Sequence, residues 1–241
     1  MKNESFSLMC SSVYNKTSKR FKQPKGVLHM ATTLKTNDFM DIMKGRRSIR
    51  NYDPAVKISK EEMTEILEEA TTAPSSVNAQ PWRFMVIDSP EGKEKLAPLA
   101  KFNQTQVATS SAVIAVFADM KNNEYLEEIY SKAVENGYMP QEVKERQIAA
   151  LTAHFEALPE QVNRETILID GGLVSMQLML AARAHGYDTN PIGGYDKEVI
   201  AETFGWDKER YVPVMLLSIG KAADEGYASY RLPIDRITEW K

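Results

Sequence analysis

The spacing of hydrophobic and polar residues predicts two helices early in the chain. Residues 38–44 have the pattern of a short helix, and a longer one starts after Ser59. Ser59 is a residue type that caps helices, and Glu62 stands three positions later, as in a capping box. Pro74 follows the second helix closely and ends it. The apolar residues on one face of this helix are Met63, Ile66, Leu67 and Ala70.

Three apolar runs rich in β-branched and aromatic residues predict strands. They cover residues 84–87, 112–117 and 211–219. Their continuous apolar character is typical of a sheet that is buried on both faces, and helical segments fall between them. Two of these segments, 124–136 and 141–157, are charged and separated by a short turn. We therefore expect a pair of helices that protrudes from the core.

Residues 167–185 form the most apolar helical segment. Because apolar side chains cover nearly every face, we expect this helix to be buried on all sides, and a subunit interface is one way to cover its second face. A membrane span needs about 20 predominantly apolar residues. This segment is interrupted by Asp170, Gln177 and Arg183, so the pattern predicts a core helix that ends at Gly186.

Composition argues against several classes of function. The chain has 241 residues and 43% hydrophobic content, which is enough for one large domain. A net charge of −3 disfavours a nucleic-acid surface, which would need a basic stripe. The single cysteine, Cys10, fits the reducing cytoplasm, and the three histidines lack the spacing of metal ligands.

The N-terminal segment differs from the rest of the chain. Residues 1–29 show no apolar periodicity, so we expect a disordered extension before a single domain at residues 30–241. Their apolar stretch is too short for a secretory signal. Met30 directly precedes the first recognisable element, so we interpret residues 1–29 as the product of an upstream start or as an added extension.

Two short tracts carry candidate chemistry. The first is Arg46-Arg47-Ser48-Ile49-Arg50. Guanidinium groups bind phosphate oxygens bidentately, although cations at this place would also offset the dipole of the preceding helix. The second is Pro74-Ser75-Ser76-Val77-Asn78-Ala79-Gln80-Pro81-Trp82, a small polar loop that ends in a rigid corner. The first tract suits a phosphate, and the second offers amides and hydroxyls to a flat polar ring.

The two tracts resemble motifs of the nitroreductase family, whose members are flavin-dependent enzymes. The family patterns are Arg-x-Ser-x-(Arg/Lys) and Ser-Ser-x-Asn-x-Gln-Pro-Trp. Pro191-Ile192-Gly193-Gly194-Tyr195-Asp196 is similar to a turn of the family, and Arg231-Leu232-Pro233 to its C-terminal motif. The resemblance implies an α+β fold of three α/β/α layers. A central, mostly antiparallel sheet is flanked by helices, a long helix lies at the dimer interface, and the C-terminal arm is exchanged between subunits.

The resemblance also implies which residues bind FMN. Arg46, Ser48 and Arg231 correspond to contacts at the phosphate end, and Arg47 to backbone and ribityl contacts. Arg50 aligns with a cation at the pyrimidine edge of the ring, where a positive charge stabilises the negative charge of the reduced flavin. Asn103 either bonds the same edge or is an ordinary loop residue.

Further contacts are implied by the loop and by the glycine motif. The loop residues that correspond to contacts from the second subunit are Pro74, Ser75, Ser76, Asn78 and Gln80. Pro191 and Ile192 lead into Gly193 and Gly194, which let the backbone approach the ring, with an amide near flavin N5. Family members often have Glu in place of Gly193. Tyr138 corresponds roughly to an aromatic residue that lines the substrate cavity in some relatives, or else only packs.

The implied function is that of an FMN-dependent NAD(P)H oxidoreductase. The family passes hydride through flavin N5 by a ping-pong mechanism to nitroaromatics, quinones or related acceptors, and works as a homodimer with flavin sites at the interface. The lack of a Gly-x-Gly-x-x-Gly motif agrees with transient binding of NADH or NADPH. No side chain is assigned as catalytic, because the flavin carries out the redox step. Alternatives are a flavin reductase, a reductive dehalogenase or another specialised flavoenzyme, and, from another class, a non-catalytic flavin-binding protein.

Overall fold

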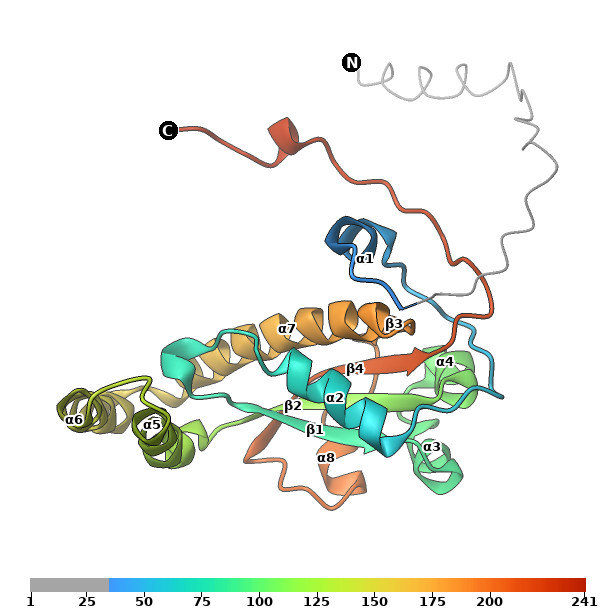
Figure 1. Ribbon diagram of the computed structural model, residues 1–241. Helices are drawn as coiled ribbons and strands as arrows, with labels where there is room; N and C mark the ends of the chain where they lie inside the picture. Colours follow the sequence, from blue (N-terminus) through green and yellow to red (C-terminus); the bar gives the residue numbers. More distant parts are fainter. Residues whose placement is uncertain (1–34) are drawn as a thin grey trace, which may run out of the picture. The chain divides into compact units, whose positions relative to one another are not determined.

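The computed structural model describes residues 35–241, which belong to one compact unit (Figure 1). The expectations for residues 1–29 lie outside the described residues, and so does Cys10.

A four-stranded antiparallel sheet forms the centre of this unit, in the order β1-β2-β4-β3. Its strands are β1 (Trp82–Ile87), β2 (Ala112–Asp119), β3 (Asp188–Ile192) and β4 (Tyr211–Gly220). Three strands confirm the predicted runs and extend them. Pro191 and Ile192 are expected in a turn from their motif, but they are the last residues of β3. Proline is tolerated there because β3 is an edge strand, where one row of backbone groups needs no ladder partner.

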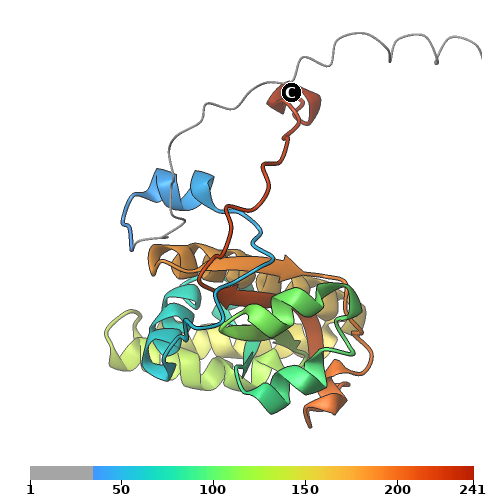
Figure 2. The same ribbon diagram turned by 90° about the vertical axis from the view of Figure 1, so that its right-hand side faces the viewer.

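Helices cover both faces of the sheet, as Figures 1 and 2 show. On one face, α2 (Lys60–Ala70) and α7 (Glu160–Ala184) pack on alternate residues of β2 such as Ile114 and Val116. On the other face, α3 (Pro90–Leu96), α4 (Gln104–Thr109) and α8 (Ile200–Thr203) belong to the layer that contacts Val113 and Phe117. The three-layer α+β architecture is therefore confirmed. The short helices α3, α4 and α8 were not predicted, because so few turns carry little periodicity.

Capping residues set the starts of the first two helices. α1 (Phe39–Gly45) begins after Asp38, whose carboxylate accepts hydrogen bonds from the amides of Met40 and Asp41 at 2.9 and 3.0 Å. The Ser59 hydroxyl accepts one from the Glu62 amide at 3.1 Å, which confirms the predicted cap of α2. Both helices therefore start where local sequence alone would start them.

The predicted helical pair is present at one end of the sheet as α5 (Leu126–Glu135) and α6 (Gln141–Ala157) (Figure 1). It packs around Ala79, which is fully buried. The Tyr130 hydroxyl of α5 also donates to the Val77 carbonyl at 3.3 Å. The pair is thus more than a protrusion, since it supports the loop at residues 74–80.

The long helix α7 starts earlier than predicted and is buried on one face only. It begins at Glu160, and its face toward the sheet includes the fully buried Val174 and Leu178. The opposite face has Ile169, Leu173 and Met176 exposed by 66%, 43% and 40%. The expectation of burial on all sides is therefore wrong for the single chain. Among residues 35–241, α7 is the one helix long and apolar enough to cross a membrane, but it packs on the sheet as a core helix.

The segment after β4 first follows the N-terminal part of the domain and then becomes exposed. Ala222 pairs with Tyr52 in an antiparallel bridge, and the Ala223 amide donates to the Asn51 carbonyl at 3.0 Å. Residues 227–241 are all exposed, with only a short 3₁₀ turn at Ile234–Arg236. This agrees with the lack of periodicity in that part of the sequence.

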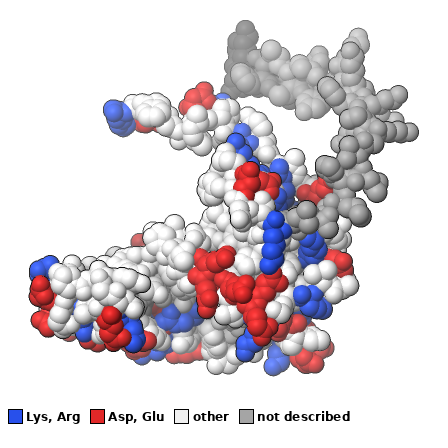
Figure 3. All heavy atoms as spheres, in the orientation of Figure 1, with Lys and Arg blue, Asp and Glu red and all other residues white. Residues whose placement is uncertain are grey.

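The surface carries both signs of charge. On the face drawn in Figure 3, acidic side chains gather in the middle, where α2 contributes the exposed Glu61, Glu65, Glu68 and Glu69. Lysine and arginine side chains lie around them in separate groups. This face therefore has no continuous basic stripe among the described residues.

Candidate functional site

The arginine tract is fixed beside the edge strand β3. Ser48 pairs with Thr189 in a parallel bridge, and the Ile49 amide donates to the Thr189 carbonyl at 3.1 Å. Ile49 is buried with Tyr52, whose hydroxyl bonds the Ser218 hydroxyl at 2.9 Å. Burial of Ile49 leaves the neighbouring polar side chains at the surface of the domain. The tract is therefore held by the sheet and does not form a free loop.

A cavity of about 460 Å³ and a larger one of about 830 Å³ are lined by half of the predicted residues. The larger one, here the arginine cavity, lies between the arginine tract and the C-terminal segment. Its lining residues among the predicted ones are Arg46, Arg47, Ser48, Arg50 and Arg231. The structure thus brings together the residues expected at a phosphate, although 183 positions separate Arg231 from Ser48 in the chain.

Arg46 is the most informative residue of the arginine cavity. Its Nη1 atom is buried and has no hydrogen-bond partner among the described residues. Burial lowers the pKa of its guanidinium, and repulsion by Arg231, Arg47 and Arg183 lowers it further. A buried donor beside several like charges is costly unless an anion accepts from it. The donor set therefore fits a phosphate group.

The other two arginines of the tract have different surroundings. The Arg47 guanidinium donates to the carbonyls of Lys44 and Arg46 at 2.8 and 3.0 Å, so its side chain caps the end of α1. Arg50 is exposed, and its Nη1 reaches only the Ser48 carbonyl at 3.4 Å. The Arg50 charge is therefore available to a ligand, whereas the Arg47 side chain is largely engaged.

The loop at residues 74–80 has a strained backbone. Val77, Asn78 and Gln80 have φ angles of 46°, 54° and 48°, in the left-handed region that non-glycine residues rarely adopt. The Ser75 hydroxyl holds the turn by accepting from the Gln80 amide at 3.1 Å. Such conformations cost of order 1–3 kcal/mol each and persist only where neighbouring contacts enforce them. This loop is therefore maintained by specific contacts.

Asp170 of α7 makes one of these contacts, and it is not among the residues predicted for the site. Both of its carboxylate oxygens accept from the Ser76 amide at 3.1 Å. The side chain is buried, which raises the pKa of its carboxyl group. A carboxylate within the most apolar helix signals that a buried charge needs some partner, but it does not say which one.

The smaller cavity, here the loop cavity, lies between the loop and α5. Asn78, Gln80 and Tyr138 line it together with Arg83 and Tyr125. Tyr138 is 81% exposed, so it does not only pack in the single chain. The loop cavity thus brings Asn78 and Gln80 of the loop close to Tyr138, the predicted substrate-lining residue. Arg83 and Tyr125 were not predicted.

The glycine motif and Asn103 form a third group. The Asn103 amide donates to the Gly194 carbonyl at 3.3 Å and accepts from Gln106 at 3.0 Å. A Cβ atom added at Gly193 or Gly194 would meet open space. Pro191, which precedes them, is exposed. This opening at the end of β3 leaves the backbone accessible to a flat ligand.

The arginine tract, the loop and the glycine motif form separate groups within one chain. The arginine cavity and the loop cavity share no lining residue. Pro74, Ser75 and Ser76 line neither of them, and Ile192 is buried in the core. The described part of a single chain therefore holds the predicted residues in several pieces of a site.

The chain is similar to several named proteins and solved structures. YdgI of Bacillus subtilis (strain 168), which is named as an NAD(P)H nitroreductase, is 92% identical over 208 residues, covering 86% of this chain and 100% of YdgI. The CLA biosynthesis enone reductase of Lactiplantibacillus plantarum is 39% identical over 193 residues, covering 80% of this chain and 89% of that protein. A crystal structure from Exiguobacterium sibiricum, described as a nitroreductase in complex with FMN, is 70% identical with a TM-score of 0.86, covering 87% of this chain and 100% of that chain.

The family model extends over most of the domain. It matches residues 43–221, which begin just before the arginine tract and end just after β4. The matched range includes the loop, the glycine motif and α7. This chain belongs to the nitroreductase family of oxidoreductases.

Proposed function

We propose that this protein is an FMN-dependent NAD(P)H oxidoreductase that reduces nitroaromatics, quinones or related acceptors. The observation that carries the proposal is the buried Nη1 of Arg46, which has no hydrogen-bond partner among residues 35–241, in a residue that lines the arginine cavity with Ser48 and Arg231. Its chemistry fits the phosphate of FMN, and a family member crystallised with FMN is 70% identical. Residues 30–241 would act as a single domain in the cytoplasm.

Each group of residues has a proposed part in holding the cofactor. Arg46, Ser48 and Arg231 bind the phosphate, and Arg50 places a positive charge at the pyrimidine edge of the ring. The Asn78 and Gln80 side chains offer amide groups to the ring, and Asn103 holds the Gly194 backbone for a further contact. When bound, FMN accepts two electrons and a proton from NADH or NADPH and passes them to the acceptor, with flavin N5 as the reacting atom.

We further propose a homodimer in which two chains complete each site. The loop of one subunit would meet the arginine tract of the other, because the two cavities are separate within one chain. The exposed apolar face of α7 supports this arrangement, since such stripes mark interaction surfaces. The exposed C-terminal segment at residues 227–241 would lie over the partner subunit.

The enone reductase relative adds one acceptor class. It is 39% identical to this chain. Reduction of a carbon–carbon double bond conjugated to a carbonyl needs the same two electrons as reduction of a quinone. Conjugated enones therefore belong among the acceptors to be tested.

An absorption spectrum of the purified protein tests the proposal first. We expect a yellow protein whose visible absorption is bleached by NADH or NADPH without oxygen and recovers when an acceptor is added. Parallel lines in double-reciprocal plots would support the ping-pong scheme. A protein that neither contains nor takes up FMN would contradict the proposal, and bound FMN that neither donor reduces would indicate a non-catalytic flavin-binding protein.

A further inference from the structure

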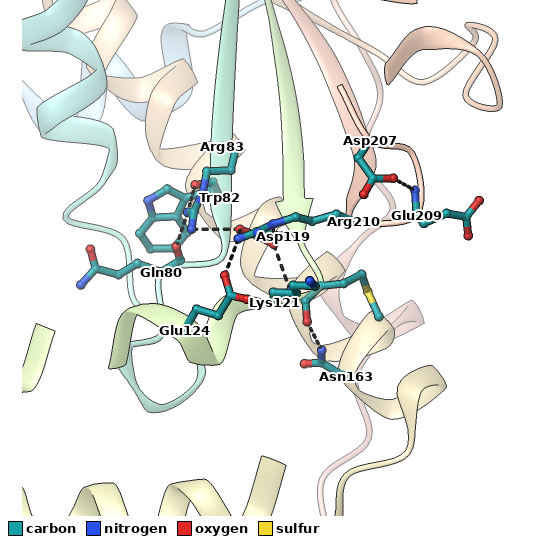
Figure 4. Close-up of polar contacts among 11 residues, drawn as sticks. Gln80, Trp82, Arg83, Asp119, Lys121, Glu124, Asn163, Asp207, Glu209 and Arg210 are labelled. Atoms are coloured by element: carbon teal, nitrogen blue, oxygen red, sulfur yellow. Dashed lines mark hydrogen bonds and ion pairs between the residues drawn. The ribbon is translucent and has the colours of Figure 1, made fainter. Parts of the chain in front are cut away.

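Asp119, at the end of β2, is a fully buried carboxylate that forms ion pairs with two guanidinium groups (Figure 4). Arg210 donates to its two oxygens from Nε and Nη2, both at 2.9 Å. Arg83 approaches the same carboxylate through Nη2 at 3.1 Å. Two cations on one buried carboxylate make a rigid junction, because each charge compensates the burial of the others.

The two arginines differ in what else they contact. Nη1 of Arg83 donates to the carbonyls of Gln80 and Trp82 at 3.0 and 2.7 Å, and its guanidinium lies 4.3 Å from the ring centre of Tyr125. Arg210 instead reaches Glu124 at 2.9 Å. Figure 4 shows the Arg83 side chain between the loop and Asp119, with Arg210 on the other side of the carboxylate. Of the two arginines, Arg83 is the one that contacts the loop.

Both backbone polar groups of Gln80 are thereby held. Its amide donates to Ser75, and its carbonyl accepts from Arg83. The φ angle of Gln80 is 48°, so the peptide would relax if one of these bonds were lost. Gln80 and Asn78 share the loop cavity with Arg83. A change at Arg83 would therefore alter where these two amide side chains lie.

We propose that Arg83, held in orientation by Asp119, is a positioning residue that fixes the Gln80 backbone and so directs the Asn78 and Gln80 amides toward the flavin. This inference rests on the proposed function, because it requires the loop to contact FMN. It adds to that function a network of residues that do not contact FMN themselves but support those that do. The network includes Asp119, the carboxylate at the end of the central strand β2.

The test compares two variants that each remove one guanidinium from the same carboxylate. Arg210→Gln loses the stronger pairing with Asp119 and the contact with Glu124 as well, but only Arg83→Gln releases the loop. For each full-length variant, FMN affinity is measured by fluorescence titration of the apoprotein, and the midpoint potential by anaerobic dye titration. We expect Arg83→Gln to weaken FMN binding by about tenfold or more and to shift the potential, while Arg210→Gln keeps the wild-type affinity and potential. Equal effects of the two variants would overturn the proposal, since the network would then be structural only.

Arg83→Lys covers the case in which Arg83→Gln does not fold. Lysine keeps a cation for Asp119, but its single ammonium nitrogen cannot replace two nitrogens that face different acceptors. We expect a folded protein whose FMN affinity stays below that of the wild type. Full wild-type affinity and potential in this variant would overturn the positioning role.

Asn78→Ala, together with FMN uptake by the wild type, separates failure of this inference from failure of the proposed function. A wild type that takes up no FMN would contradict the proposed function itself. If Asn78→Ala weakens FMN binding but the Arg83 variants do not, the loop contacts FMN without help from Arg83. If Asn78→Ala leaves affinity and potential unchanged, the loop is not part of the FMN site, and both the loop assignment and the positioning role are overturned.

Discussion

Arg46 has a buried donor without a partner among residues 35–241, and several like charges surround it. The two features together favour an anionic ligand. Its guanidinium is repelled by Arg231, Arg47 and Arg183, and the pairing of Arg183 with Asp188 at 2.9 Å offsets only part of this charge. Without a ligand this repulsion destabilises the charged guanidinium, whereas a bound phosphate would compensate it. Affinity for the phosphate end of FMN is thus expected to depend strongly on this residue.

Arg46→Ala is expected to weaken FMN binding by about tenfold or more, because it removes a charge-assisted hydrogen bond. Fluorescence titration of the apoprotein measures the dissociation constant. Arg146→Ala is the matched control, since Arg146 is an exposed arginine on α6 that does not line the arginine cavity. Equal affinities of the Arg46 variant and the wild type would remove Arg46 from the site.

Arg50→Ala tests a different part of the cofactor. Loss of a positive charge beside the ring makes the reduced, negatively charged flavin less stable, so the midpoint potential should fall, by about 30 mV for each 1.4 kcal/mol of lost stabilisation. Most of the FMN affinity should remain, because Arg46 and Arg231 still bind the phosphate. Arg50→Lys keeps the charge and should keep most of the potential. Identical potentials in the wild type and Arg50→Ala would refute the role at the ring edge.

At the scale of elements, α7 links the sheet to the loop. Its buried face packs on β2 and β4, and Asp170 on the same helix holds the Ser76 amide. The loop is supported from the other direction by Tyr130 of α5. The two helices thus hold the loop in a strained conformation that the loop would not keep by itself.

Burial of Asp170 should make part of the stability depend on pH. The folded state has the raised pKa and holds a proton more tightly than the unfolded state. The free energy of unfolding therefore decreases as pH rises from the ordinary carboxyl pKa, about 4, through the raised value. Asp170→Asn does not titrate, so urea unfolding between about pH 4 and pH 7 should show a smaller decrease than in the wild type. Asp235→Asn, at an exposed position, should follow the wild-type curve, and parallel curves for all three proteins would contradict the assignment.

At the scale of the whole molecule, the apolar face of α7 and the separate cavities are the basis of the proposed dimer. Ile169, Leu173 and Met176 are spaced so that they share one side of the helix. Membership of the nitroreductase family makes a second copy of the same chain the expected partner. The site would then be a property of the dimer, with residues from both subunits.

Leu173→Glu is expected to prevent association, because it places a charge in the centre of the apolar face. Light scattering coupled to size-exclusion chromatography measures the mass in solution. FMN occupancy should fall together with dimer content if the site needs two chains. Val199→Glu changes an exposed apolar residue away from α7 and should leave the mass unchanged. A wild-type protein that is monomeric and still binds FMN would contradict the dimeric site.

Local sequence by itself determined much of this protein. The Ser59 cap, the apolar runs of three strands and the helical pair act over a few residues, so they could be predicted correctly. The family could be recognised from short motifs because each motif concentrates unusual chemistry in a few positions. The edge strand β3 and the short helices escaped this reasoning, since their signals are weak or are masked by proline and glycine.

Tertiary structure alone decided how distant residues combine. Nothing in the local pattern indicated that Asp170 would hold Ser76, 94 positions away, or that Asp119 would join Arg83 to Arg210. These contacts depend on the order of strands and on which helix covers which face. The exposed face of α7 is likewise visible only after folding, because the composition of a helix does not say which of its apolar faces the sheet will cover.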